Sequence, residues 1–310
     1  MTIPMVPFAG EMSYCLIKSM QMVLAYRGRE YPIAWLETVS GEPFGFVYIR
    51  DKESFFAVDG YAYHEAGEHL LRTLNYSYTY TGATNDEEAL ARLEGALKSG
   101  PVVVGMLDMG YLTYMPEHRN LRGVDHAIVV LALQPDVVVV HDPAGYVAVP
   151  LPLDDFLAAW QRDIYTGKPY GLWQIGQQGE APADEAIWQR TLARARENFK
   201  REAEELFPGG PIVLYGPAGM RSLASDIQSW PKISLGMLPH FSWRVSGQRC
   251  QASAAYLHAK LPEAAAIRWE ESQLYGQLQR ASAFNERAVL CALLEQLAER
   301  EEAFIAALLA

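Results

Sequence analysis

The chain has 310 residues, of which 50% are apolar and 20% charged, so it can form a hydrophobic core and is not a disordered segment. Its net charge of −11 argues against binding to nucleic acid or to an anionic membrane, because both rely on an excess of lysine and arginine. The longest apolar run, 127–133, is far shorter than the ~20 residues that a membrane helix needs.

Three cysteines, Cys15, Cys250 and Cys291, are too few and too scattered for a disulfide framework or a cysteine-rich zinc site. The N-terminus lacks the basic flank and the long apolar core of a signal peptide. We therefore expect a reducing, cytoplasmic location.

The first part of the chain mixes helix and strand patterns. The segment CLIKSMQMVLAY predicts a helix at 15–26 that ends before Gly28, with an apolar stripe of Met12, Leu16, Met20, Val23 and Leu24. Next come a predicted strand at 44–49, a helix at 64–74, an exposed, alternating strand face of Tyr76, Tyr78 and Tyr80, and a helix at 86–97 capped by Asn85 or Asp86.

Three strand-like runs follow, at 101–106, 127–133 and 137–141, and the turn at 134–136 predicts that the last two form a hairpin. A short helix is expected at 153–160, capped by its pair of aspartates, and a last strand at 172–175. The polar segment 177–184 predicts a boundary between domains 1–178 and 179–310.

Beyond this boundary the pattern is helical. Residues from Trp188 to Leu206 recur every three or four positions, which predicts one helix, and 208–211 breaks it. A helix is expected at 220–230, and the last ~65 residues predict two long helices, the final one with the stripe Leu290, Leu294, Leu297, Phe304 and Leu308. The sequence thus indicates an α+β fold with an all-helical C-terminal domain.

Cys15 opens the first helix, where the positive end of the helix dipole stabilises a thiolate and so favours a nucleophile. His126 begins a strand and Asp142 ends the next one, so in an antiparallel hairpin their side chains can meet if they share a face. A carboxylate bonded to one imidazole nitrogen leaves the other free to deprotonate a thiol. His141 points to the opposite face and is the poorer candidate. Taken singly, Cys15 and His126 are more often structural residues.

The order Cys, His, Asp is that of papain-like folds, with a helix packed on an antiparallel sheet. CLIKSMQMVLAYRG and DHAIVVLAL…VVVHDPAGYVAVPLPLDDFLAAW resemble the catalytic segments of papain-like peptidases that cleave double-glycine leader peptides. The family of butirosin biosynthesis protein H is closer. LKSGPVVVGMLDMGYLTYMP (97–116) resembles its segment before the histidine strand, and 216–231 and 249–265 resemble its C-terminal domain.

This resemblance implies cysteine-dependent acyl chemistry, by an acyltransferase or an amide or peptide hydrolase, in secondary metabolism. Cys15 is then the nucleophile, His126 the general base and acid, and Asp142 the orienting group. It implies a small-molecule, peptidyl or acyl-thioester substrate, with an acyl carrier protein and a second copy of the chain as candidate partners. No cofactor or metal is expected.

Two alternatives stay open. The stretch PFAGEMSY before Cys15 contains no Gln or Asn to donate to an oxyanion, which favours a catalytically silent binding or scaffold protein on the same fold. An unrelated two-domain protein with a coincidental triad would have unpaired strands around His126 and Asp142.

Other signals are weaker. His64 and His69 lie five residues apart, which on a helix does not place them on one face for zinc. The segment Gly216–Gly219 reads as a helix-start turn rather than a phosphate loop. Tyr111 and Tyr114 either pack in the core or line a cleft. Arg119 and Arg122 either form a basic patch for a carrier protein or lie in a free loop.

Overall fold

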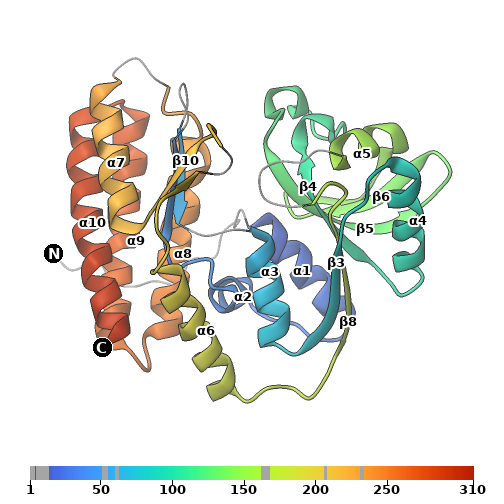
Figure 1. Cartoon of the computed structure of the whole chain (residues 1–310), viewed down its shortest axis with the longest axis horizontal. Coiled ribbons are helices and arrows are strands. Elements are labelled where there is room, and N and C mark those ends of the chain that lie inside the picture. The colour runs from blue at the N-terminus through green and yellow to red at the C-terminus, as the bar shows by residue number, and fades with distance from the viewer. Residues whose placement is uncertain are drawn as a thin grey trace. The chain divides into compact units, whose positions relative to one another are not determined.

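The computed structural model describes residues 4, 14–50, 55–59, 63–161, 168–205, 208–230 and 234–310 (Figure 1). The chain divides into two compact units. We call the one that holds Ser13–Leu36 and Ala62–Ile187 the sheet unit, and the one that holds Glu37–Tyr61 and Trp188–Ala310 the helical unit. The secondary structure confirms the α+β class with a helical C-terminal region.

The sheet unit contains a six-stranded antiparallel sheet with the strand order β3-β8-β4-β5-β6-β7. Its strands are β3 (Tyr76–Thr81), β4 (Val102–Asp108), β5 (Asp125–Leu133), β6 (Val137–Asp142), β7 (Tyr146–Pro152) and β8 (Leu172–Gln178). Its main helices are α1 (Cys15–Tyr26), α3 (Tyr63–Thr73), α4 (Asp86–Leu97) and α5 (Leu153–Trp160). Short 3₁₀ turns lie at Met109–Tyr111 and His118–Leu121.

The helices cover this sheet from both sides. On one side, α4 and α5 share a hydrophobic cluster with alternate residues of the central strands, such as Val102 and Val104. On the other side, α1 packs against β4 and β5, and α3 packs on α1 (Figure 1). Gly67 of α3 allows this close approach, because a Cβ there would collide with the side chains of Met20 and Leu16.

The helical unit contains a four-stranded antiparallel sheet with the order β2-β1-β10-β9. Its strands are β1 (Phe46–Arg50), β2 (Phe55–Asp59), β9 (Glu204–Glu205) and β10 (Ile212–Tyr215). Its helices are α7 (Gly216–Ser229), α8 (Trp243–Leu257), α9 (Pro262–Ala283) and α10 (Arg287–Leu309), with a π-helical turn at Leu238–Ser242. The helices α2 (Ile33–Ser40) and α6 (Asp184–Asn198) contribute residues to both units.

The observed division differs from the boundary at 178/179 that the sequence suggested. The strand β1, far ahead of that boundary, pairs with β10 from the C-terminal part, with Val47 opposite Tyr215. Its side chains Phe46 and Tyr48 lie in one hydrophobic cluster with α7, α8, α9 and α10. The C-terminal part is therefore not all-helical, because it supplies two strands to a sheet that an early segment completes.

Several predicted elements begin and end at the residues that the sequence indicated. The helices α1, α4 and α5 have the predicted bounds, and Asn85 caps α4 by accepting the Glu88 N–H at 2.9 Å. The aspartates Asp154 and Asp155 lie in the first turn of α5 but do not cap it, because Pro152 occupies the N-cap position. The predicted strands correspond to β1, β4, β5, β6 and β8, and the predicted hairpin is formed by β5 and β6.

The helix predicted from Trp188 to Leu206 is too long. The helix α6 ends at Asn198, whose side-chain amide donates to the carbonyls of Gly41 and Phe44 at 3.1 and 3.0 Å. Beyond Asn198 the predicted helix does not continue, because Glu204 pairs with Val213 in a β-sheet. The final stripe from Leu290 to Leu308 is buried as predicted.

Other expectations need adjustment. The tyrosines of β3 alternate as predicted but form its more buried face, with Tyr76 5% exposed and Tyr80 stacked on Trp173. Three long helices, α8, α9 and α10, fill the region where two were expected. Within the described ranges, no helix combines the length and the apolarity that crossing a bilayer requires.

Candidate functional site

Cys15 is the first residue of α1 and is partly exposed. Two side chains of the same helix fix α1 against the sheet. Ser19 donates to the Ala127 carbonyl of β5, and Lys18 donates to the Pro143 carbonyl after β6, both at 3.1 Å. Since Ala127 adjoins His126 and Pro143 adjoins Asp142, these bonds set the position of the Cys15 thiol relative to both.

His126 lies near the start of β5 and is buried, with 7% of its surface exposed. Its Nε2 is 2.8 Å from Oδ1 of Asp142, and its side chain also hydrogen-bonds to Cys15. Because Asp142 takes Nε2, Nδ1 is the nitrogen that is left for the sulfur. The structure thus joins Cys15, His126 and Asp142 in one hydrogen-bonded chain.

The strand register brings the histidine and the aspartate together. The strands β5 and β6 pair antiparallel with Val130 opposite Val140, so the start of β5 lies beside the end of β6. This pairing contradicts the alternative of a coincidental triad on unpaired strands. His141 takes no part in the chain, because its Nδ1 accepts the Ala148 N–H at 2.9 Å.

Asp142 is 4% exposed and accepts three hydrogen bonds. Its Oδ1 accepts from His126 and from the Ala144 N–H at 2.7 Å, and its Oδ2 accepts from the Tyr114 hydroxyl at 2.6 Å. Burial works to raise the pKa of this carboxyl, but the bonds from His126, Tyr114 and Ala144 together hold it below the usual value. Asp142 is therefore a carboxylate at neutral pH.

The electrostatics favour a charged imidazole. Burial alone would lower the pKa of His126, but the hydrogen bonds to Asp142 and Cys15 outweigh it and raise the pKa to about 10. An imidazolium beside a sulfur favours the thiolate, the form of cysteine that attacks carbonyl carbons. The arrangement can therefore form a nucleophile and return a proton to a leaving group.

Tyr114 is the part of this site that sequence analysis missed. The sequence suggested that Tyr114 either packs in the core or lines a cleft. In the structure its hydroxyl donates a hydrogen bond to Asp142. The two residues are 28 positions apart, and no short spacing motif links them. The signal available was the similarity of the segment 97–116 to a family segment that contains this tyrosine.

The remaining candidates lie elsewhere. His69 Nε2 contacts the Thr73 hydroxyl at 3.2 Å, and the side chain of His64 is outside the described part. Among the residues that the structure describes, no three His, Cys, Asp or Glu side chains gather as a metal site. Arg122 lies over the ring of Tyr111, 5.1 Å from its centre. The segment Pro7–Ser13, where an oxyanion donor was sought, also falls outside the described residues.

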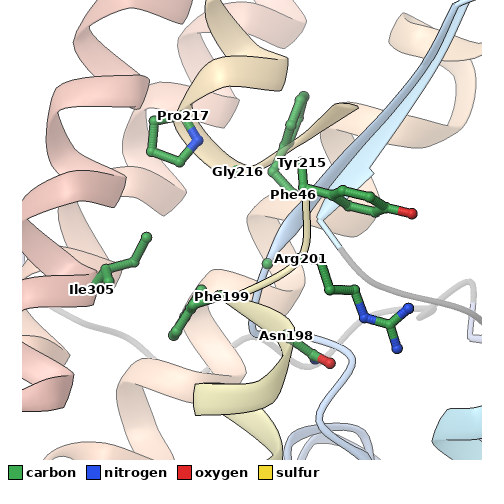
Figure 2. A pocket seen from close by; sticks show the side chains of 9 residues that line it. Phe46, Asn198, Phe199, Arg201, Tyr215, Gly216, Pro217 and Ile305 are labelled. Atoms are coloured by element: carbon green, nitrogen blue, oxygen red, sulfur yellow. The ribbon is translucent and has the colours of Figure 1, made fainter. Parts of the chain in front are cut away.

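A small cavity in the helical unit lies at the start of α7 (Figure 2). Its volume is about 60 Å³, which holds a few water molecules. It is lined by Gly45, Phe46, Asn198, Phe199, Arg201, Tyr215, Gly216, Pro217 and Ile305. None of the three site residues lines it, and α7 begins at Gly216, four residues ahead of the predicted start at 220.

Comparison with known proteins supports the sequence resemblance. Residues 14–143 match the family "Butirosin biosynthesis protein H, N-terminal", and residues 210–309 match the family "YobF C-terminal domain". The chain is also similar to "Uncharacterized protein YobF" of Bacillus subtilis (strain 168), at 26% identity over 317 residues that cover 97% of each chain. The resemblance to the butirosin biosynthesis protein H family is thus confirmed, and Cys15, Tyr114, His126 and Asp142 all lie in the matched range.

Proposed function

From this family match and the geometry of the site, we propose that the protein is a cysteine-dependent acyl-transfer enzyme, acting as an acyltransferase or as an amide or peptide hydrolase. We further propose that the activity belongs to secondary metabolism, which the description of the matched family, named after a protein of butirosin biosynthesis, supports. The observation that carries the proposal is the hydrogen-bonded chain from Cys15 through His126 to Asp142.

In the first half of the reaction, the Cys15 thiolate attacks the acyl carbonyl and forms a carbon–sulfur bond. The bond from the carbonyl carbon to the leaving group breaks, and the leaving atom takes the proton that His126 carries. The product is a thioester on Cys15. Asp142 stays ionised and stabilises the imidazolium until the proton has left.

In the second half, an amine or a water molecule attacks this thioester. His126 accepts the proton of the attacking group, and the Cys15 thiolate leaves, so the starting enzyme is restored. The N–H of Cys15, at the first turn of α1, has no partner within the helix and is the backbone donor offered to the carbonyl oxygen. A small molecule, a peptide or an acyl-thioester is the proposed donor, with an acyl carrier protein and a second copy of this chain as proposed partners.

One observation favours a second candidate, a catalytically silent binding protein with the same site. The segment from Pro7 to Tyr14 contains no Gln or Asn for the oxyanion. Loss of one such donor costs about 10²–10³ in rate. The two candidates differ in whether Cys15 carries an acyl group during turnover.

Intact-mass spectrometry tests this difference. The protein is incubated with acyl-pantetheine thioesters and with peptide donors, and the mass of the chain is measured after quenching in acid. We expect the added mass of one acyl group in the wild type and in Cys291→Ala, and none in Cys15→Ala. Cys291 is a suitable control because its partly exposed thiol donates to the Ala224 carbonyl, at 3.2 Å, and is not part of the site.

An equal adduct on Cys15→Ala, or no adduct with any donor, would overturn the enzymatic proposal. In the second case, alkylation by iodoacetamide identifies the silent protein. Cys15 would then react no faster at neutral pH than an ordinary thiol, of which only a few per cent is ionised.

A further inference from the structure

The hydroxyl of Tyr114 donates a hydrogen bond to the oxygen of Asp142 that is bonded neither to the histidine nor to the backbone. Oδ1 accepts the bonds from His126 and from the Ala144 N–H, whereas Oδ2 accepts the 2.6 Å bond from Tyr114. A carboxylate whose two oxygens are both held by donors cannot rotate without breaking a bond. Its orientation toward His126 is therefore fixed by the bond from Tyr114 as well as by the bonds on Oδ1.

Tyr114 is itself held in place by contacts other than Asp142. Its ring packs at a tilt against that of Tyr146, with 5.1 Å between the ring centres. The preceding residue, Thr113, donates to the Asp155 carboxylate of α5 at 2.7 Å, and the following one, Met115, is buried in the hydrophobic cluster. Since both neighbours anchor the loop, the hydroxyl is presented to Asp142 by the fold.

We propose that Tyr114 is a positioning residue of this site, whose hydroxyl keeps Asp142 ionised and turned toward His126. The proposal rests on the proposed function, because the purpose of an oriented Asp142 is to support the imidazolium beside Cys15. Tyr114 acts through Asp142 and does not touch the sulfur or the acyl group.

The groups around Asp142 determine whether its pKa rises or falls when the hydroxyl of Tyr114 is removed. The groups around Asp142 are His126 on β5 and Tyr114 after β4, with Tyr146 of β7 beside Tyr114, Cys15 bonded to His126 and the Lys18 ammonium on the carbonyl of Pro143. Burial and the nearby carboxylate raise the pKa of Tyr114 well above its ordinary value, so the phenol remains a neutral donor. Removing it takes away one bond that favours the carboxylate, and Asp142 then protonates at higher pH.

The variant Tyr114→Phe tests this, since it keeps the ring and removes only the donor. The ¹Hε1 resonance of His126, assigned by its loss in His126→Gln, is followed by NMR through the acid range, where it reports the protonation of Asp142. We expect the acid inflection of Tyr114→Phe to lie about one pH unit above that of the wild type, as the loss of a hydrogen bond to a charged group predicts.

The matched control is Tyr170→Phe. The Tyr170 hydroxyl also donates to an aspartate of the sheet unit, Oδ1 of Asp86, at 2.5 Å. We expect its inflection to coincide with that of the wild type. The proposal is overturned if Tyr114→Phe also coincides with the wild type, or if both variants shift equally. A wild-type inflection at or above the ordinary value for aspartate overturns it without any variant.

A kinetic readout separates positioning from simple support of the fold. With a donor that acylates Cys15, the ratio of the Tyr114→Phe rate to the wild-type rate should be about tenfold lower on the acid limb than above neutral pH, which follows from a shift of one unit. A merely structural role would lower the rate equally at every pH. Failure of the proposed function appears differently, as a missing adduct on Cys15 in the wild type, while the NMR shift persists.

Discussion

Each unit of the molecule buries a network of charged side chains, and the two networks differ in what they leave accessible. In the sheet unit, Asp142 and His126 are almost fully buried, but the chain ends at Cys15, which is partly exposed. A reactive group at the end of a buried network can meet a substrate.

In the helical unit the network is closed. Arg249 bridges Glu37 and Glu42 at 2.7 Å each, and their side chains are at most 5% exposed. Arg268 bridges Glu271 and Glu301 at 2.6 and 3.0 Å, with 1% of its side chain exposed, and its guanidinium also donates to the Pro43 carbonyl. Apart from the Arg268–Glu271 pair within α9, these ion pairs join segments that are distant in sequence.

The comparison teaches that burial and charge alone do not indicate a functional site. Both networks contain carboxylates with shifted pKa values, yet only the sheet unit combines them with a nucleophile that solvent reaches. In the helical unit, Arg249 and Arg268 each lie between two carboxylates, and both of their side chains are at most 5% exposed. We interpret that network as structural.

The largest effect that would test the difference between the two networks is expected from removing the proposed base of the site, His126. His126→Gln should lower the rate of acylation of Cys15 by about 10²–10⁴, because general acid–base catalysis contributes a factor of that size. His141→Gln, on the neighbouring strand, should leave the rate unchanged. Stopped-flow or quenched mass spectrometry measures both, and equal rates in the two variants would mean that His126 is not the base.

The closed network predicts an effect on stability instead. Arg249→Met leaves Glu37 and Glu42 buried without their partner, which should reduce the free energy of unfolding by about 3–5 kcal/mol. Arg221→Ala, which removes an exposed ion pair with Glu302, should cost at most about 1 kcal/mol. Urea denaturation followed by circular dichroism compares them, and similar losses would show that the buried network does not support the helical unit.

A smaller effect concerns pH. Burial of Glu42 outweighs the attraction of Arg249 and raises the pKa of its carboxyl from 4.5 to about 8. The folded state then binds this proton more tightly than the unfolded state, so stability falls as pH rises from about 4.5 to about 8. Glu42→Gln should flatten the fall of the urea midpoint over this range without abolishing it, because the pKa of Glu37 is also raised.

The stability of the sheet unit should respond in a higher pH range. The raised pKa of His126 means that its contribution to stability is complete below about 6.5 and is lost as pH rises through about 10. His126→Gln should flatten that upper range only. If one substitution flattened both ranges, the two networks would not titrate independently.

The elements that sequence analysis predicted well are those whose signals are local. The helix α1 has a continuous apolar stripe and a glycine after its end, and α4 has an asparagine cap, so their bounds follow from a few neighbouring residues. The hairpin of β5 and β6 follows from a short turn between two apolar runs. Because this hairpin fixes which residues lie opposite each other, the meeting of His126 with Asp142 was also predictable.

Some of the features that were missed depend on distant partners. The strand β10 is four residues long and exists because β1, more than 150 positions earlier, lies beside it. The bond between Tyr114 and Asp142 likewise joins a turn to the last residue of β6, and no local pattern relates the two. The side chain of Asn198, the last residue of α6, is likewise bound to the carbonyls of Gly41 and Phe44, more than 150 positions earlier.

The sequence alone thus determined the α+β class, the first helix with its cysteine and the strand pair that carries the histidine and the aspartate. Periodicity, capping and hairpin turns act over a few residues, and a single chain displays them directly. Only the tertiary structure decided the membership of β1 in the helical unit, the hydroxyl on Asp142 and the closed ion pairs of Arg249 and Arg268. Those contacts are made between segments whose proximity is settled by packing of the whole unit, and no property of either segment in isolation encodes the distance between them.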